Sequence, residues 1–388
     1  MKGALSPLVI LAVLIGLFFT FAPGMFESSM NKVLPVDFRQ PTPAAIKLHE
    51  SLQIGDLHAD STLWQRDLLE RGNRGQVDIP RLREGNVALQ VFTTVTKSPL
   101  GLNAERNSAD ALDTITILAI AQRWPMATWN SRKQRAIHQA SVLHELAARA
   151  PEEFSLILDR SDLTSLLATR ASGSQIIGGI IGTEGSHALD GELTAIDELF
   201  DAGFRVMSLQ HFFDNKLGGS LHGLSGDGLT EFGRNAVDRM IEKEIIIDVA
   251  HSSPAVVSEV LARSSRPLIV SHTGFYGHCQ SPRNINDELM QEIAAAGGLM
   301  GVGYWDLAVC ETSVASIVSA IRYGIDLVGE DHVALGSDFD GTVTTPLDTS
   351  QLIHLTTEML AQNFTETEIR KVMGENILRF MAQNLPAK

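Results

Sequence analysis

Two histidines stand at the ends of two apolar segments of the sequence, with a short helix signal between the segments. His251 and His272 each follow a run that predicts a buried strand. Ser253 is a favoured helix N-cap residue, and Pro254 suits the first helical position. The pattern predicts a βαβ unit with parallel strands, whose carboxyl ends lie on one face. Both imidazoles could then reach a common cation, so we expect a metal site. The two strand segments are residues 245–251 and 268–272.

Other predicted strands also end on side chains that bind metals. In His58-Ala59-Asp60 the first and third side chains of an extended segment point to the same face, and Glu184 ends a further strand. This nitrogen and oxygen set suits Zn²⁺, with Mn²⁺ or Co²⁺ as substitutes. Two ions that share a bridging carboxylate would use all five ligands and leave room for a water whose pKa falls toward about 7. The expected ligands are His58, Asp60, Glu184, His251 and His272.

A structural alternative exists for every one of these residues, because polar side chains commonly mark the point where a buried strand reaches the surface. An H-x-D tripeptide alone is weak evidence for a metal. The joint placement of the five residues at strand ends is what favours the metal site. We expect the remaining histidines, apart from His211, to be structural.

The elements that would position these residues alternate between short apolar runs and longer helical ones. Continuous apolar runs are typical of parallel strands covered on both faces. Eight β-rich runs, several of them continuously apolar, predict an α/β protein of the (β/α)₈ TIM barrel type, with a doubly wound open sheet as the alternative. No glycine-rich nucleotide-binding loop follows the first run, which argues against nucleotide-binding open sheets. The predicted strands are residues 54–57, 87–92, 176–181, 205–209, 245–249, 268–270, 299–302 and 333–335.

Helical periodicity fills the segments between these runs. Residues 102–170 are too long for one crossover helix and predict two or three extra helices. Thr365 and Glu368 form a capping box that predicts a closing helix as far as about Met381. The clearest predicted helices between strands are residues 231–244, 287–296 and 314–328.

Composition limits the class of protein. The chain has 388 residues, 44% of them hydrophobic and 20% charged, as in ordinary globular enzymes. Its formal charge of -15 and the lack of basic runs argue against a nucleic-acid partner. The first 26 residues are apolar enough for a signal peptide or a membrane anchor, so we expect export to the periplasm or anchoring with the catalytic domain outside the cytoplasm. Residues 27–48 are expected to be a connector, and residues 49–384 the catalytic barrel domain.

The motifs taken in order resemble the membrane dipeptidase (renal dipeptidase) family of zinc peptidases over residues 45–382. Related amidohydrolase barrels usually begin with H-x-H and often carry a bridging Lys, where this chain has Asp60 and Glu184. The motifs that carry the resemblance are His58-Ala59-Asp60, Gly182-Thr183-Glu184-Gly185, His211, Asp248-Val249-Ala250-His251, Ser271-His272, Ser281-Pro282-Arg283-Asn284 and Ser337-Asp338-Phe339-Asp340-Gly341.

The resemblance implies that His58 and Asp60 bind one zinc ion, that His251 and His272 bind the other, and that Glu184 bridges them. It also implies three roles in binding substrate and in catalysis. His211 would polarise the scissile carbonyl, Asp338 would carry a proton from the attacking water to the leaving amine, and Arg283 would bind the free carboxylate of a dipeptide. The structural alternatives are a core histidine, a helix-capping aspartate and a surface arginine, respectively.

Three further expectations follow from the resemblance. From the sequence itself Cys279 and Cys310 are either one disulfide or two free thiols, and the family pattern favours the disulfide. The family also tends to form homodimers. Residues 303–307 differ from the stretch in mammalian members and are expected to line a side-chain pocket.

The expected function is therefore hydrolysis of dipeptides with a free C-terminal carboxylate by a binuclear zinc enzyme. A related metal-dependent amide hydrolase acting on lactams, N-acyl amino acids or D-amino-acid dipeptides is the alternative. An anchored protein that binds metal without turnover is a second alternative, which the presence of His211 and Asp338 disfavours.

Overall fold

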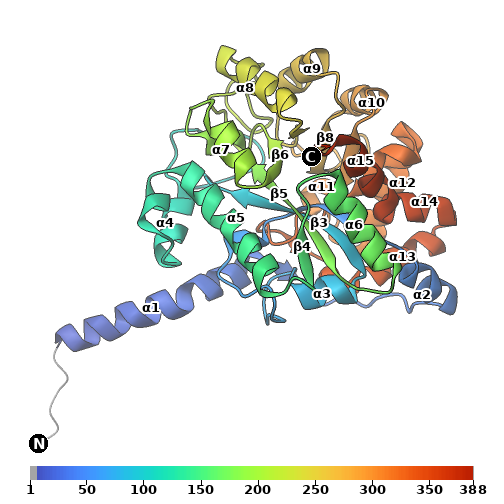
Figure 1. Ribbon diagram of the computed structural model, residues 1–388, viewed down its shortest axis with the longest axis horizontal. Coiled ribbons are helices and arrows are strands. Elements are labelled where there is room, and N and C mark those ends of the chain that lie inside the picture. Colours follow the sequence, from blue (N-terminus) through green and yellow to red (C-terminus); the bar gives the residue numbers. More distant parts are fainter. Residues whose placement is uncertain (1–6, 388) are drawn as a thin grey trace, which may run out of the picture.

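Eight parallel strands close into a barrel in the computed structural model, which describes residues 7–387 (Figure 1). The hydrogen-bonded order is β3-β2-β10-β9-β8-β7-β6-β5, and a β3–β5 pairing closes the ring. The predicted (β/α)₈ barrel is confirmed, and all eight predicted strands are present. The barrel strands are β2 (Ile54–Ala59), β3 (Val87–Val95), β5 (Ile177–Glu184), β6 (Phe204–Ser208), β7 (Ile246–Asp248), β8 (Ile269–Thr273), β9 (Leu299–Val302) and β10 (Val333–Leu335).

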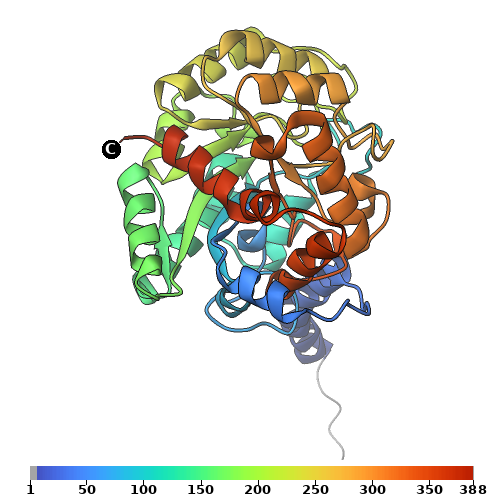
Figure 2. The ribbon, with the colours of Figure 1, turned by 90° about the vertical axis from the view of Figure 1, so that its right-hand side faces the viewer.

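Helices connect successive strands and surround the barrel (Figures 1 and 2). Residues 102–170 contain three helices, as the length of this segment predicts. Ser253 caps α9 through its side chain, with Pro254 at the first helical position. The helices of the barrel region are α3 (Ile79–Glu84), α4 (Thr114–Ala121), α5 (Arg132–Arg149), α6 (Arg160–Ala171), α7 (Ala195–Asp201), α8 (Glu231–Glu242), α9 (Pro254–Arg263), α10 (Asp287–Ala295), α11 (Asp306–Val309), α12 (Val314–Val328) and α13 (Ile353–Ala361).

The C-terminal helix closes the end of the barrel opposite the strands' carboxyl ends. The predicted capping box of Thr365 and Glu368 starts α14 (Glu366–Arg370), which continues through a π-helical turn, η6 (Lys371–Glu375), into α15 (Asn376–Asn384). Apolar side chains of α15 join those that fill the barrel interior, so α15 lies across its base (Figure 2). The interior cluster includes Leu57, Leu89, Val91, Ile180, Val206, Ile246, Ile269, Leu299, Ile377 and Phe380.

One short strand of the main sheet lies outside the predicted set. The strand β4 (Phe154–Leu156) pairs in parallel with the first residues of β5, ahead of the part of β5 that pairs with β6. Three residues, two of them only half-buried, are too few to show a periodic pattern, which explains why sequence analysis did not find β4.

The N-terminal region begins with a long apolar helix, α1 (Pro7–Met30), which projects from the barrel (Figure 1). Among residues 7–387, α1 is the helix long and apolar enough to span a membrane. Residues 1–6, where the predicted leader starts, lie outside the described residues. Residues 27–48, expected to be a connector, contain the end of α1, β1 (Lys32–Val33) and most of α2 (Pro43–Glu50). The strand β1 pairs with β11 (Thr344–Thr345), beyond β10.

Candidate metal centre and active site

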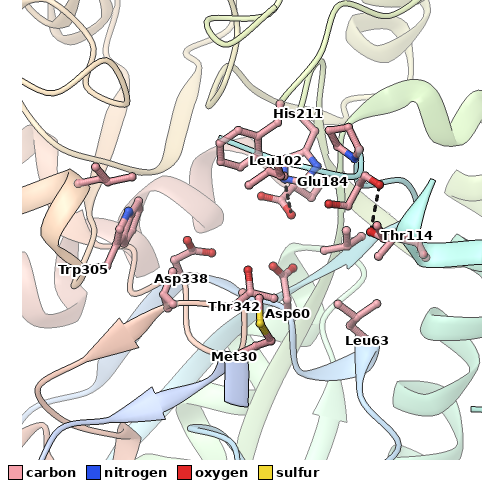
Figure 3. A pocket seen from close by; sticks show the side chains of 18 of the residues that line it. Met30, Asp60, Leu63, Leu102, Thr114, Glu184, His211, Trp305, Asp338 and Thr342 are labelled. Atoms are coloured by element: carbon pink, nitrogen blue, oxygen red, sulfur yellow. Dashed lines mark hydrogen bonds and ion pairs between the residues drawn. The ribbon is translucent and has the colours of Figure 1, made fainter. Parts of the chain in front are cut away.

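The side chains singled out in the sequence converge at the carboxyl ends of the barrel strands. They border a cavity of about 840 Å³ (Figure 3). His58 and His272 are not among its lining residues, and both are fully buried. The strands β2 and β8 carry these two histidines, while loops that follow strands supply most of the others. The predicted residues on the cavity wall are Asp60, Glu184, His211, His251, Arg283 and Asp338.

The carboxylate of Glu184 occupies the centre of the cluster. Its Oε1 lies 3.3 Å from Nε2 of His251 and 3.4 Å from Nε2 of His272. The same oxygen lies 3.6 Å from Nε2 of His58, and Nε2 of His58 is also 3.6 Å from Oδ1 of Asp60. The five expected ligands therefore surround one space, with the Glu184 carboxylate among the imidazoles.

The ligand atoms form two overlapping groups that share Glu184. One group contains His58, Glu184, His272 and Asp338, and the other contains Glu184, His211 and His251. The resemblance instead assigned His58 with Asp60 to one ion and His251 with His272 to the other. The two arrangements agree on Glu184 as the shared residue. They differ in the partners of His272, whose Nε2 lies 2.9 Å from Nε2 of His251. The two groups also contain Asp338 and His211 and leave out Asp60.

A buried hydroxyl sets the tautomers of two of these histidines. Ser271 donates through Oγ to Oδ2 of Asp248 at 2.6 Å. With its only proton committed, Oγ can accept from Nδ1–H of His58 at 3.0 Å and from Nδ1–H of His272 at 2.9 Å. Both Nε2 atoms then keep a free electron pair directed toward Glu184. A metal ligand oriented through its second nitrogen is typical of histidine metal sites.

Asp56 supports the cluster from beneath. Its carboxylate accepts hydrogen bonds from the backbone N–H of His58 and from the backbone N–H of Ser337, both at 3.0 Å. Asp56 therefore ties the end of β2 to the segment that carries Asp338. His251 and Asp338 both adopt positive φ, 61° and 59°, a backbone conformation that is uncommon for residues other than glycine and is often found at functional sites.

The electrostatics of the cluster favour a bound cation. Burial, reinforced by neighbouring positive groups, holds the pKa values of His251 and His272 well below the usual range, so both imidazoles are neutral and can donate electron pairs. Burial and then the charge of Asp60 raise the pKa values of Glu184 and Asp338 well above their usual range. Crowded buried carboxylates beside neutral imidazoles form a donor set that fits divalent metal ions.

Three residues outside the expected ligand set border the same space. Burial lowers the pKa of His211 to about 4, and its Nε2 lies 3.4 Å from Oε2 of Glu184. Asp338 points into the cavity, with Oδ1 3.8 Å from Nε2 of His58 (Figure 3). Arg283 is not a surface arginine. It is buried and donates through Nη2 to the carbonyl of His272 at 2.9 Å, while its Nη1 has no hydrogen-bond partner among the described residues.

Comparison with known proteins decides the family. The model of the membrane dipeptidase family (peptidase family M19) matches residues 43–387, which is most of the chain. The chain belongs to the membrane dipeptidase family. Membrane dipeptidases are metallopeptidases, so the cluster around Glu184 is the metal-binding part of a dipeptidase.

Individual relatives agree with this assignment. Dipeptidase ataJ of Aspergillus terreus is 27% identical over 339 residues, which cover 80% of this chain and 77% of the relative. Dipeptidase AC, a metallopeptidase of family M19, has the same fold, with a TM-score of 0.70 at 23% identity, covering 87% of this chain and 100% of the other. The probable dipeptidase PvdM from Pseudomonas aeruginosa superposes with a TM-score of 0.71 at 18% identity, covering 88% and 98%.

A third solved structure is a metallopeptidase from Rhodobacter sphaeroides liganded with a phosphinate mimic of the dipeptide L-Ala-D-Ala. It superposes on this membrane dipeptidase with a TM-score of 0.67 at 22% identity, covering 86% of this chain and 99% of the other.

Sequence analysis assigned no role to several residues that shape this dipeptidase site. Ser271 and Asp248 both lie within the motifs that carry the resemblance. Ser271 directly precedes His272, and Asp248 ends β7, and these positions could have indicated that both residues support the ligands. Cys279 and Cys310 form a disulfide, as the family pattern implied. The bond tethers the loop that leads to Arg283 to the end of α11.

Proposed function

We propose that this membrane dipeptidase is a binuclear zinc enzyme that hydrolyses dipeptides with a free C-terminal carboxylate. The observation that carries the proposal is the position of Glu184, whose two carboxylate oxygens face three buried imidazoles on one side and His211 on the other. A carboxylate in that position can be shared by two cations. When bound, the two ions would polarise the scissile carbonyl and supply an activated water.

The proposed ligands are those expected from the sequence. His58 and Asp60 would hold one zinc ion, His251 and His272 the other, and Glu184 would bridge the two. The short separation of the His251 and His272 Nε2 atoms supports a shared cation, because both atoms would present electron pairs to it. Asp338 lies close enough to His58 to reach the first ion, so its role needs a separate test.

Two buried side chains would act on the reacting atoms. Neutral His211 carries one ring proton, and its Nδ1 lies 3.3 Å from the carbonyl of Lys97. With the proton on Nε2 instead, His211 would donate a hydrogen bond to the carbonyl oxygen as negative charge develops there. The raised pKa of Asp338 suits a group that accepts a proton from water and then gives it to the leaving amine.

Arg283 would select for dipeptides. Its guanidinium is fixed by the His272 carbonyl and by the Trp305 ring, 5.3 Å away, while Nη1 is free to bind a carboxylate. A longer peptide has an amide group at this position and would leave the buried guanidinium of Arg283 without an anionic partner.

A substrate panel tests this proposal. We expect turnover of L-Ala-L-Ala and at least a hundredfold lower kcat/KM for its C-terminal amide, because the amide lacks the charge that Arg283 binds. Arg283→Lys should raise KM for the free dipeptide far more than for the amide. Equal turnover of acid and amide would contradict the proposed role of the carboxylate.

The second candidate is hydrolysis of L,D dipeptides or related amides. The ligand of the Rhodobacter sphaeroides relative, a mimic of L-Ala-D-Ala, favours including these substrates. Parallel assays of L-Ala-L-Ala, L-Ala-D-Ala, an N-acyl amino acid and a lactam separate the candidates. The two dipeptides differ only in the configuration of the C-terminal residue, and the N-acyl amino acid and the lactam lack a free amine.

We also propose the cellular setting that the sequence indicates. The exposed apolar helix α1 supports a segment of residues 1–26 that directs export or anchors the chain, with the barrel of residues 49–384 outside the cytoplasm. A homodimer is proposed on the family tendency alone. Fractionation of cells and size measurement of the detergent-solubilised protein test both statements.

A further inference from the structure

The cavity beside Glu184 has one wall that does not come from the barrel. Phe26 and Met30, from the last turns of α1, line it together with Asp60, Glu184 and Asp338. Figure 3 shows Met30 beside Thr342, on the same side of the cavity as Asp60. The match to the family model starts at residue 43, so the family pattern does not include these two residues.

A buried ion-pair network fixes this end of α1. Glu27 is only 1% exposed and forms ion pairs with Arg66 and Arg74. Arg66 also pairs with Asp340, two residues beyond Asp338. An unpaired buried carboxylate would be costly, so Glu27 keeps α1 seated against the barrel only while this network is intact.

Further contacts attach the residues just after α1 to the loop that follows β10. The side-chain oxygen of Asn31 accepts a hydrogen bond of 2.8 Å from the backbone N–H of Thr342. Lys32 and Thr344 are register partners in the β1–β11 pair, and Thr342 and Thr344 both line the cavity. The attachment therefore holds the loop after β10 as well as α1.

The wall supplied by α1 is apolar and continues an apolar surface of the barrel loops. Phe26 lies against Trp64, with ring centroids 6.2 Å apart. Leu63, Leu102 and Ile115 line the same region. The metal-binding groups occupy the polar side, so an amphipathic dipeptide could place its amide at the metals and a side chain against this wall.

We propose that Phe26 and Met30 are specificity-determining residues, and that the site favours dipeptides with a bulky apolar side chain. This inference rests on the proposed dipeptidase function. It also requires that the chain keeps the end of α1 in the working enzyme, since removal of residues through Met30 would remove one wall of the substrate cavity.

The test compares L-Leu-L-Leu with L-Ala-L-Ala in full-length protein. We expect Met30→Ala and Phe26→Ala each to lower the ratio of kcat/KM for the Leu substrate over the Ala substrate by about fivefold or more, because apolar contact is lost only with the larger substrate. The matched control is Met25→Ala on the same helix, where Met25 is 71% exposed and does not line the cavity. Its ratio should stay within about twofold of the wild type.

A conservative variant protects the test against simple misfolding. Met30→Leu keeps the approximate volume and the apolar character of the side chain, so it should keep most of the wild-type preference for the Leu substrate over the Ala substrate. An unchanged ratio in both alanine variants would overturn the inference while leaving the dipeptidase proposal intact. Failure of the wild type to hydrolyse either dipeptide would instead reject the proposed function. Recovery from cells of an active mature chain that begins after Met30 would also overturn the inference.

Discussion

The Ser271 hydroxyl lies 2.9 Å from Nδ1 of His272 and donates its own proton to Asp248. The same oxygen is 3.0 Å from Nδ1 of His58. One hydroxyl therefore orients two proposed ligands from different strands, and it does so by accepting from both Nδ1 atoms. This relationship leads to a prediction about metal affinity.

Ser271→Ala should weaken metal binding by about 10- to 100-fold, because neither Nδ1 then has its hydrogen-bond acceptor and the orientation of both rings is lost. Titration with a competing chelator measures the change. Ser265→Ala, at an exposed position in the loop before β8, serves as the control and should bind metal as the wild type does. Unchanged affinity in Ser271→Ala would show that the hydroxyl does not orient the ligands.

Asp338→Asn should abolish dipeptide turnover while the metal content stays near two per chain, because an amide cannot carry the proton that the leaving amine needs. Metal analysis and activity are measured on the same preparation. Asp338 lies within ligand distance of the His58 group, so joint loss of metal and turnover would place it among the ligands instead.

The barrel could be predicted from the sequence because its strands are short runs rich in apolar residues, and the ligands could be predicted because polar residues end those runs. The sequence could not predict which other ligands His272 lies beside. Its neighbours depend on the directions of side chains that come from distant loops at the carboxyl ends of the barrel strands. The role of Met30 gave no signal either. Its helix has the composition of a membrane segment, and only packing against the loop after β10 brings it to the cavity.

The closing helix should contribute a pH-dependent part of the stability. Two hydrogen bonds from Arg322, supported by the Thr365 cap, lower the pKa of Glu368 to about 2. A carboxylate with a depressed pKa stabilises the folded state above its unfolded value of 4.5, and this contribution is lost as pH falls toward about 2.

Glu368→Gln should therefore lower the free energy of unfolding by about 1 kcal/mol at pH 7, since the pair is partly exposed to solvent. The difference from the wild type should shrink between pH 5 and about 2, which thermal melts at several pH values measure. If the stability difference between wild type and Glu368→Gln stayed constant over this pH range, the lowered pKa of Glu368 would be contradicted. Glu366→Gln, at an exposed position two residues earlier in α14, should change stability less.

The disulfide between Cys279 and Cys310 should support substrate binding as well as stability. It closes a segment with a sequence separation of 31 that includes Arg283 and Trp305. Replacing both cysteines by serine should lower the free energy of unfolding by about 3 kcal/mol and raise KM for dipeptides more than it lowers kcat, because the segment positions the carboxylate-binding group. An unchanged KM would show that Arg283 is held without the disulfide.

The most direct test of the central claim is metal content measured together with dipeptide turnover in the same full-length preparation, before and after chelation and again after zinc is restored. The account predicts two metal ions per chain, loss of turnover as they are removed, and recovery when two equivalents of zinc return. Full turnover of L-Ala-L-Ala by chelated protein with no measurable metal would contradict it.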